Sequence, residues 1–210
     1  GAQRFGIVTA TKDLTHGKFL DRVLASIRAV AAEGNVQADA SLGIIRDPEI
    51  AVMLREAGMR EMNHNLETSR RFFPEVCTTH DYEERVTTIR YAKQAGLAVC
   101  SGGIFGMGET WEDRIDLALE LRALDVDTVP LNFLHRIDGT PLQNAVPMTP
   151  MEILKSIAIV RLLLPRAEIK VAGGREVNLR TLQPLMFAAG ANSTMVGNYQ
   201  IGRASCRERV

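Results

Sequence analysis

Polar side chains that could bind a ligand recur at the carboxyl ends of the predicted strands. A single group of this kind is most simply a turn. Successive groups that combine amides, a thiol, carboxylates and a guanidinium predict instead a site for a polar ligand. The groups are Thr9 and Thr11, Asp39 and Ser41, Asn63 to Asn65 with Glu67, Cys100 with Ser101, Asn132 with His135, and Arg175 with Glu176.

The stretch NHNLE, residues 63–67, is the sharpest of these groups. In a strand, Asn63 and Asn65 project to one side and His64 to the other. If the two amides face the interior, they offer donors and acceptors to a ligand. His64 then faces the helices, and we expect it to have a structural role.

The stretch GGIFGMGET, residues 102–110, predicts a close approach between the backbone and a ligand, because glycine permits it. It lacks the spacing of a dinucleotide fingerprint. Glu109 is expected either at the ligand or at the start of the next helix, where a carboxylate is favourable.

Other chemistries are not indicated. His16, His80 and His135 lack the spacing of a zinc site. No carboxylate pair or Ser/His/Asp set predicts acid–base or nucleophilic catalysis, so a reaction at this site would depend on cofactors.

Seven stretches with strand character alternate with helical patterns, which predicts parallel strands joined by right-handed crossovers. Seven such units are one short of a (β/α)8 barrel. The alternative is an open doubly wound sheet, which would concentrate function at one crevice. Because nearly every strand ends in polar residues, we favour a TIM-like α/β barrel with about seven βα units. The strands are 4–10, 35–43, 59–65, 97–106, 126–134, 168–174 and 192–198, and the helices are 18–34, 47–58, 80–96, 110–124, 149–165 and 176–190, the last broken at Pro184.

Composition is that of one globular domain. The chain has 210 residues, zero formal net charge and 46% hydrophobic residues, which indicates neither disorder nor a nucleic-acid or membrane partner. Its three cysteines fit a reducing cytoplasm. A homodimer is compatible with this composition. We expect residues 1–200 to form the barrel, cut at its amino end, and 201–210, including Cys206, to be a non-native or disordered tail.

Four sets of motifs resemble the biotin synthase family of radical S-adenosylmethionine enzymes, in order and at the family's spacing from about residue 4 to residue 200. They are NHNLETS, CSGGIFGMGET, VPLNFL with GTPL, and AGGREVN with AAGANSTMVGNY. The resemblance implies a (β/α)8-type barrel and a sulfurtransferase that converts dethiobiotin to biotin. It implies S-adenosylmethionine, a [4Fe–4S] cluster and an auxiliary iron–sulfur cluster as cofactors.

The resemblance also assigns roles to matching residues. Cys100 and Arg175 would be ligands of the auxiliary cluster. The other roles concern the small molecules: Asn63, Asn65 and Asn132 would contact dethiobiotin or orient S-adenosylmethionine, Glu67 would contact its ribose, and the turn from Gly103 to Glu109 would lie along its methionyl portion.

Two departures from the family qualify this interpretation. The Cx3Cx2C motif of the [4Fe–4S] cluster is absent and is expected before residue 1, so this chain alone is not expected to cleave S-adenosylmethionine. The family has cysteines where this chain has Gly6 and Asp39. The hypothesis is therefore a variant auxiliary cluster held by Cys100, Cys77 and either Arg175 or Asp39. An equally weighted alternative is that Cys77 is a small buried apolar residue and not a ligand.

Two other functions stay open at this point. One is a related radical S-adenosylmethionine enzyme without sulfur insertion, maturase-like or mutase-like. The other is a non-catalytic barrel that binds a small metabolite.

Overall fold

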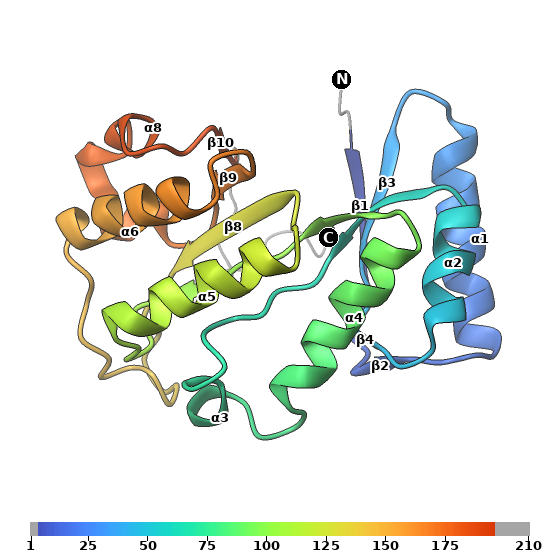
Figure 1. Cartoon of the computed structure of the whole chain (residues 1–210), viewed down its shortest axis with the longest axis horizontal. Helices are drawn as coiled ribbons and strands as arrows, with labels where there is room; N and C mark the ends of the chain where they lie inside the picture. Colours follow the sequence, from blue (N-terminus) through green and yellow to red (C-terminus); the bar gives the residue numbers. More distant parts are fainter. Residues whose placement is uncertain (1–3, 196–210) are drawn as a thin grey trace, which may run out of the picture.

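The computed structural model describes residues 4–195 of the chain (Figure 1). The predicted tail 201–210 and Cys206 lie outside these residues. Within them, seven parallel strands pair in the order in which the chain makes them, and an eighth, β7 (Gly103–Phe105), pairs with β8. The seven are β1 (Arg4–Val8), β3 (Gln37–Ser41), β5 (Met59–Asn63), β6 (Ala98–Cys100), β8 (Thr128–Phe133), β9 (Glu168–Val171) and β10 (Ser193–Thr194).

This order confirms the predicted fold class. A doubly wound sheet reverses direction at a switch point, whereas here each strand lies beside its successor, as in a (β/α) barrel. The described strands form part of such a barrel, with β1 and β10 at its two edges. No helix among the described residues is long and apolar enough to cross a bilayer.

The long helices begin at the capping residues that the sequence offers. Asp81, Thr110 and Thr149 each form a capping box with the acid three residues later, and Asp47 caps α2 by accepting from Glu49 N. The helices are α1 (Lys18–Ala32), α2 (Pro48–Glu56), α4 (Tyr82–Gln94), α5 (Trp111–Ala123) and α6 (Pro150–Leu163).

The last predicted helix is broken, as expected from Pro184. It comprises α7 (Arg175–Leu179), a 3-10 turn (Arg180–Leu182) and α8 (Leu185–Ala188). Pro184 precedes α8, where its missing N–H costs no helical bond.

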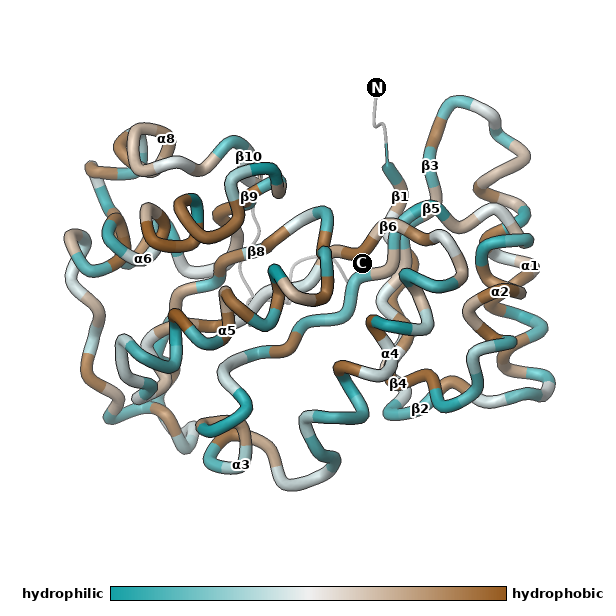
Figure 2. Tube along the Cα trace, in the orientation of Figure 1, coloured by the Kyte–Doolittle hydropathy of each residue, from teal (hydrophilic) through white to brown (hydrophobic). Residues whose placement is uncertain are grey.

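The two faces of the sheet differ in polarity because side chains alternate along each strand. Along β8, Val129, Leu131 and Phe133 are buried in the core against the helices. Thr128 and Asn132 point to the opposite, concave face. Figure 2 shows the apolar colour on β8 and β6 and along parts of the helices. The apolar face holds the fold together, and the concave face is left for polar chemistry.

Three features of the fold were not predicted. A two-stranded sheet pairs β2 (Asp13–Leu14) with β4 (Ile44–Ile45). A short helix, α3 (Phe73–Val76), follows the fifth strand. The predicted strand 97–106 is split at Ser101–Gly102 into β6 and β7.

Candidate functional site

A polar cavity of about 390 Å³ lies at the carboxyl ends of β1, β3 and β5. This is the edge at which barrel enzymes build their sites. Its lining combines hydroxyl, amide, carboxylate and basic groups. The lining residues are Thr9, Thr11, Lys12, Ser41, Gly43, Ile44, Asn63, His64, Asn65, Glu67, Thr79, His80 and Arg85.

The NHNLE segment is fixed by main-chain hydrogen bonds to the split strand. The amides of Leu66 and Glu67 both donate to the carbonyl of Gly102, at 3.0 and 3.1 Å. In return, the amide of Ile104 donates to the carbonyl of Glu67 at 2.8 Å. Glu67 has a φ of 71°, a left-handed conformation that is uncommon outside glycine. The segment therefore has a well-defined path, and one residue in it is strained.

The two asparagines are engaged differently. The side-chain oxygen of Asn65 accepts from the amide of Gly102 at 3.2 Å. No hydrogen bond within the described part of the chain engages the side-chain amide of Asn63. Both residues line the cavity, as the sequence predicts. Asn63 thus has its full hydrogen-bonding capacity available to a ligand.

Arg85, from α4, forms the opposite wall with His80. Its Nη1 donates to the carbonyl of Asn65 at 2.6 Å and lies 3.6 Å from Oε1 of Glu67. Burial raises the pKa of Glu67, and the charge of Arg85 and a hydrogen bond from Asn65 oppose that rise. The sequence-based reasoning missed Arg85, His80 and Lys12 as parts of this site.

His64 is buried, as its predicted structural role requires, but it also lines the cavity. Its Nε2 has no hydrogen-bond partner among the described residues. Burial, followed by the positive charge of Arg85, lowers the pKa of His64 to about 3. The ring is therefore neutral at physiological pH.

Cys100 lies on the concave face, next to a network of charged groups. Arg4 Nη1 donates to Glu61 Oε1 at 2.8 Å and lies 3.6 Å from Asp39 Oδ2. Thr128, which pairs with Cys100 in the sheet, donates from its hydroxyl to Glu61 Oε2 at 3.3 Å. Asp39 is buried, and its other oxygen, Oδ1, has no hydrogen-bond partner within residues 4–195.

Lys170 is a second cation that acts on this face, beside Arg4. Burial, followed by the charge of Glu61, raises the pKa of Cys100 to about 12, and Lys170 opposes that rise. Burial and Glu61 likewise raise the pKa of Asp39 to about 6, opposed by Arg4 and Lys170. The alternation of EIKV places Lys170 on the concave face, because Ile169 and Val171 are in the core. This alternation could have identified Lys170 as a site residue from the sequence, but the prediction did not include it.

Arg175 lies at the start of α7, beyond the end of β9. It lies two residues beyond Gly173, whose carbonyl accepts from the amide of Phe133. Phe133 is five residues past the sheet partner of Cys100, or roughly 16 Å along the strand. Arg175 pairs with Glu176 at 3.5 Å. The glycine turn thus carries Arg175 past the end of β9 (Glu168–Val171), and its shared role with Cys100 as a cluster ligand stays a prediction.

A second cavity, of about 150 Å³, contains Arg175 and Asn132. The Asn132 amide bridges three strand ends: its nitrogen donates to the carbonyl of Gly103 at 3.3 Å, and its oxygen accepts from the amide of Gly173 at 2.9 Å. Asn132 therefore holds the sheet together here and keeps one N–H for a ligand.

The glycine turn approaches protein backbone closely. A Cβ on Gly103 would lie 2.3 Å from the carbonyl oxygen of Glu67, and one on Gly102 would lie 1.9 Å from that of Pro130. Glu109 is buried: Oε1 accepts from Arg114 Nε at 2.8 Å, and both oxygens accept from the amide of Gly106. These contacts account for Gly103 and Glu109 without a ligand.

Cys77 follows α3, where its sulfur lies 3.5 Å from His80 Nδ1. Burial acts to raise the pKa of Cys77, but hydrogen bonds from Thr79 and His80 outweigh burial and lower it. Cys77 therefore contacts His80, which lines the 390 Å³ cavity, but does not line that cavity itself.

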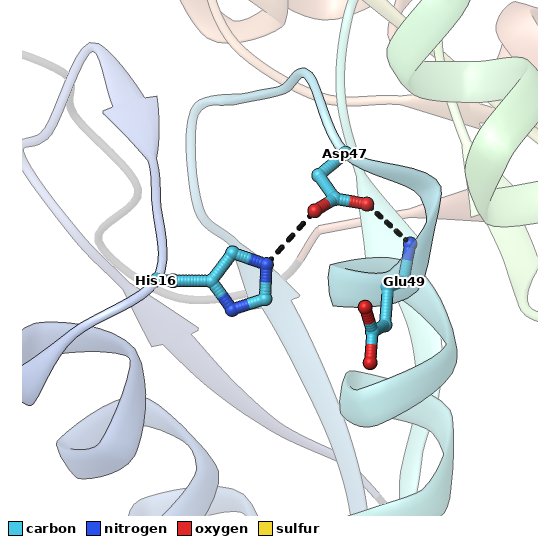
Figure 3. A group of neighbouring side chains, drawn as sticks. All are labelled: His16, Asp47 and Glu49. Atoms are coloured by element: carbon cyan, nitrogen blue, oxygen red, sulfur yellow. Dashed lines mark hydrogen bonds and ion pairs between the residues drawn. The ribbon is translucent and has the colours of Figure 1, made fainter.

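His16, Asp47 and Glu49 form a further group, whose ligand atoms lie within 4.8 Å of one another (Figure 3). One oxygen of Asp47 accepts from His16 at 2.9 Å and the other from the amide of Glu49 at 2.9 Å. Because both oxygens are engaged at a helix N-terminus, whose dipole disfavours cations, the geometry is that of a helix cap.

Comparison with protein families gives two matches. The Radical SAM superfamily model matches residues 8–121, and the Biotin and Thiamin Synthesis associated domain matches residues 130–210. The chain is 57% identical over 199 residues to a biotin synthase of Geobacter sulfurreducens, covering 95% of this chain and 60% of that protein. It is 52% identical over 207 residues to a biotin synthase of Geotalea uraniireducens, covering 98% and 63%. The chain thus spans about 60% of the length of these curated relatives.

Solved structures show the same fold. Methylornithine synthase superposes with a TM-score of 0.77 at 23% identity, covering 91% of this chain and 56% of that one. A FeFe-hydrogenase maturase from Carboxydothermus hydrogenoformans superposes with a TM-score of 0.72 at 14% identity, covering 91% and 46%. At these identities the likeness concerns the fold alone.

Proposed function

Because the chain belongs to the radical S-adenosylmethionine superfamily, we propose that the full-length protein is a biotin synthase, which inserts sulfur into dethiobiotin. The observation that carries the proposal is the identity of 57% to a biotin synthase over 95% of this chain. The site supports it, because a cavity of amides and a carboxylate lies on the same sheet as a buried thiol.

Membership of the superfamily implies S-adenosylmethionine and a [4Fe–4S] cluster. Bound together, they supply a radical able to abstract hydrogen from an unactivated carbon. The three cysteines of this chain, at 77, 100 and 206, do not form a Cx3Cx2C motif, so we assign no residue of this chain to that cluster.

In the large cavity, Asn63 and Glu67 offer the groups that remain open to a ligand. The Glu67 carboxylate suits the two hydroxyls of a ribose, because an ionised carboxylate is an acceptor only. Asn63 offers both donors and acceptors to the cyclic urea of dethiobiotin. Asn65 orients the segment through its bond to Gly102. Asn132, Gly103 and Glu109 contribute by holding the strand ends in register.

The concave face fits an auxiliary iron–sulfur cluster in part. It offers one buried thiol, Cys100, and one carboxylate oxygen without a partner, on Asp39. Thiolate is the usual protein ligand of such iron, so we propose Cys100 as a ligand and Asp39 as a second. Cys77 lies beside His80 and Arg175 lines the 150 Å³ cavity, and we derive no step of the reaction through this cluster.

A second function has one observation in its favour. Asp39 and Glu61 put carboxylates on the concave face, bound to Arg4, beside Cys100. A radical S-adenosylmethionine enzyme without sulfur insertion would need no thiolates there.

The test uses the full-length protein, reconstituted anaerobically with iron and sulfide and supplied with dethiobiotin, S-adenosylmethionine and a reductant. We expect both 5′-deoxyadenosine and biotin. In Cys100→Ala we expect 5′-deoxyadenosine to persist and biotin to fall to background, with Cys77→Ala as the matched control. Biotin formation unchanged in Cys100→Ala would contradict the role of this thiol, and 5′-deoxyadenosine without any biotin in the unaltered protein would favour the second function.

A further inference from the structure

We propose that Arg175 binds the carboxylate of the substrate, in the cavity of about 150 Å³ at the carboxyl ends of β7, β8 and β9. The identity of the substrate rests on the proposed function, since dethiobiotin carries a carboxylate on an aliphatic chain, at the end opposite its cyclic urea. The preference for an aliphatic carboxylate rests on the cavity itself. The family resemblance implies another role for this residue, as a ligand of the auxiliary cluster, and the two roles predict different results.

The guanidinium of Arg175 is largely buried, yet it has little to bind. Its side chain is 11% exposed, and within residues 4–195 no side-chain hydrogen bond engages it. Its ion pair with Glu176 Oε1 is long, at 3.5 Å, and the side chain of Glu176 is itself 49% exposed. A buried charge is costly unless it is paired and hydrogen-bonded. The five donors of this guanidinium therefore point to an anionic partner.

The glycine turn before Arg175 sets its position. Gly174 has a φ of 76°, and a Cβ on it would lie 1.8 Å from the carbonyl oxygen of Phe133. The side-chain nitrogen of Asn178 donates to the carbonyls of Leu134 at 3.1 Å and Gly174 at 2.9 Å, which ties α7 to the end of β8. Arg175 is thus held in place before a ligand arrives, and this reduces the ordering cost of binding.

The rest of the cavity is mainly apolar. Apolar residues line it from β7, from the end of β8 and the loop that follows, and from α7. They are Ile104, Phe133, Leu134, Ile137 and Val177. Asn132 adds one N–H that its bonds to Gly103 and Gly173 leave free. A guanidinium among apolar residues suits a carboxylate on an aliphatic chain, because the chain leaves water while the charge is paired.

This cavity and the large one lie on the two flanks of β7. On one flank β7 pairs with β8, where Ile104 lies opposite Asn132, and both residues line the small cavity. On the other flank Gly103 bridges to Glu67, which lines the large cavity. Neighbouring strands are about 4.8 Å apart. One ligand can therefore place its urea in the large cavity and its carboxylate in the small one.

The test measures binding by isothermal titration calorimetry to the full-length protein, reconstituted with its clusters and S-adenosylmethionine but without reductant, so that no turnover occurs. The ligands are dethiobiotin and its carboxamide, which keeps the chain and the urea but carries no charge. The variants are Arg175→Met and Arg175→Lys. Arg166→Met is the matched control, because Arg166 is exposed and lines neither cavity. Iron and sulfide content reports on the clusters, and thermal melting reports on folding.

In the unaltered protein and in Arg166→Met, we expect the Kd of the carboxamide to exceed that of dethiobiotin about fivefold or more, since bonds between charged groups are the stronger ones. In Arg175→Met the Kd of dethiobiotin should rise about tenfold or more, and the two ligands should then bind within about threefold of each other. Arg175→Lys should keep part of the preference, because it retains the charge without the planar fork. Iron and sulfide content should stay unchanged.

Three results would overturn the inference. The first is an unaltered protein that binds dethiobiotin and its carboxamide equally. The second is a preference for the carboxylate that persists in Arg175→Met or, if that variant does not fold, stays undiminished in Arg175→Lys. The third is a loss of iron and sulfide from Arg175→Met, which a cluster ligand predicts.

An unaltered protein that binds neither ligand would contradict the proposed function. Hexanoate and hexanamide, which carry no urea, then test the cavity by themselves. A failure of hexanoate to bind more tightly than hexanamide would overturn the inference as well.

Discussion

The buried imidazole of His64 predicts a measurable dependence of stability on pH. His64 is 7% exposed, its Nε2 has no partner among the described residues, and its pKa is lowered to about 3. In the unfolded chain the same ring titrates near its ordinary value of 6.5. Between these two values the unfolded state binds a proton that the folded state does not bind, so stability decreases as the pH falls.

The size of the effect follows from the two pKa values. At about pH 5, protonation of the ring stabilises the unfolded state by about 2 kcal/mol. This pH lies about 1.5 units below the ordinary pKa of the ring, and each unit is worth about 1.4 kcal/mol. At about pH 7.5 the gain is close to zero. A decrease from about pH 7.5 to about pH 5 should therefore lower the unfolding free energy by about 2 kcal/mol because of His64. Replacing it by glutamine, which does not titrate, should remove that cost.

The assay is urea unfolding of the unaltered protein and of His64→Gln at the two pH values, followed by the fluorescence of Trp111, the single tryptophan of the chain. The comparison uses the change between pH values within each protein, so any packing defect of the variant cancels. Equal pH-dependent losses in both proteins would refute the reasoning, because His64 would then titrate alike in the folded and unfolded states.

Three further predictions follow from contacts in the site. Gly103→Ala should cost about 1–3 kcal/mol of unfolding free energy, because its Cβ would lie 2.3 Å from a carbonyl oxygen, while Gly6→Ala, with open space around it, should melt like the parent. Asn132→Ala should lose about 1–3 kcal/mol in urea unfolding, because it leaves a partly buried amide and carbonyl unpaired; full stability would argue against the bridge. Iodoacetamide at neutral pH should label Cys77, whose pKa is lowered, well before the buried Cys100, as followed by peptide mass spectrometry, and the reverse order would contradict both assignments.

Local patterns predicted the fold well because each acts over a few residues. The predicted helices begin at Asp81, Thr110 and Thr149, which form capping boxes with the acids that follow, and Pro184 breaks the last helix as expected. The split of the strand at Gly102 was missed, because it depends on a loop more than thirty residues away in sequence that donates to this glycine.

The site could be predicted only where its residues lie on strand ends. Asn63, Asn65 and Glu67 line the cavity because strand alternation directs them there. Arg85 and Lys170 were missed, because long side chains act at a distance from their own backbone, one from a helix and the other from within a strand. The position of Arg175 relative to Cys100 could not be predicted, because the number of residues in a glycine turn does not reveal how far it carries the chain.

The split between β6 and β7 has a consequence for ligand access. Along that side, the wall of the large cavity is joined to the sheet through the amides of Leu66, Glu67 and Ile104. Widening the opening there would break main-chain bonds of the sheet itself. A small molecule is therefore expected to enter and leave without a displacement of the wall that Leu66, Glu67 and Ile104 hold.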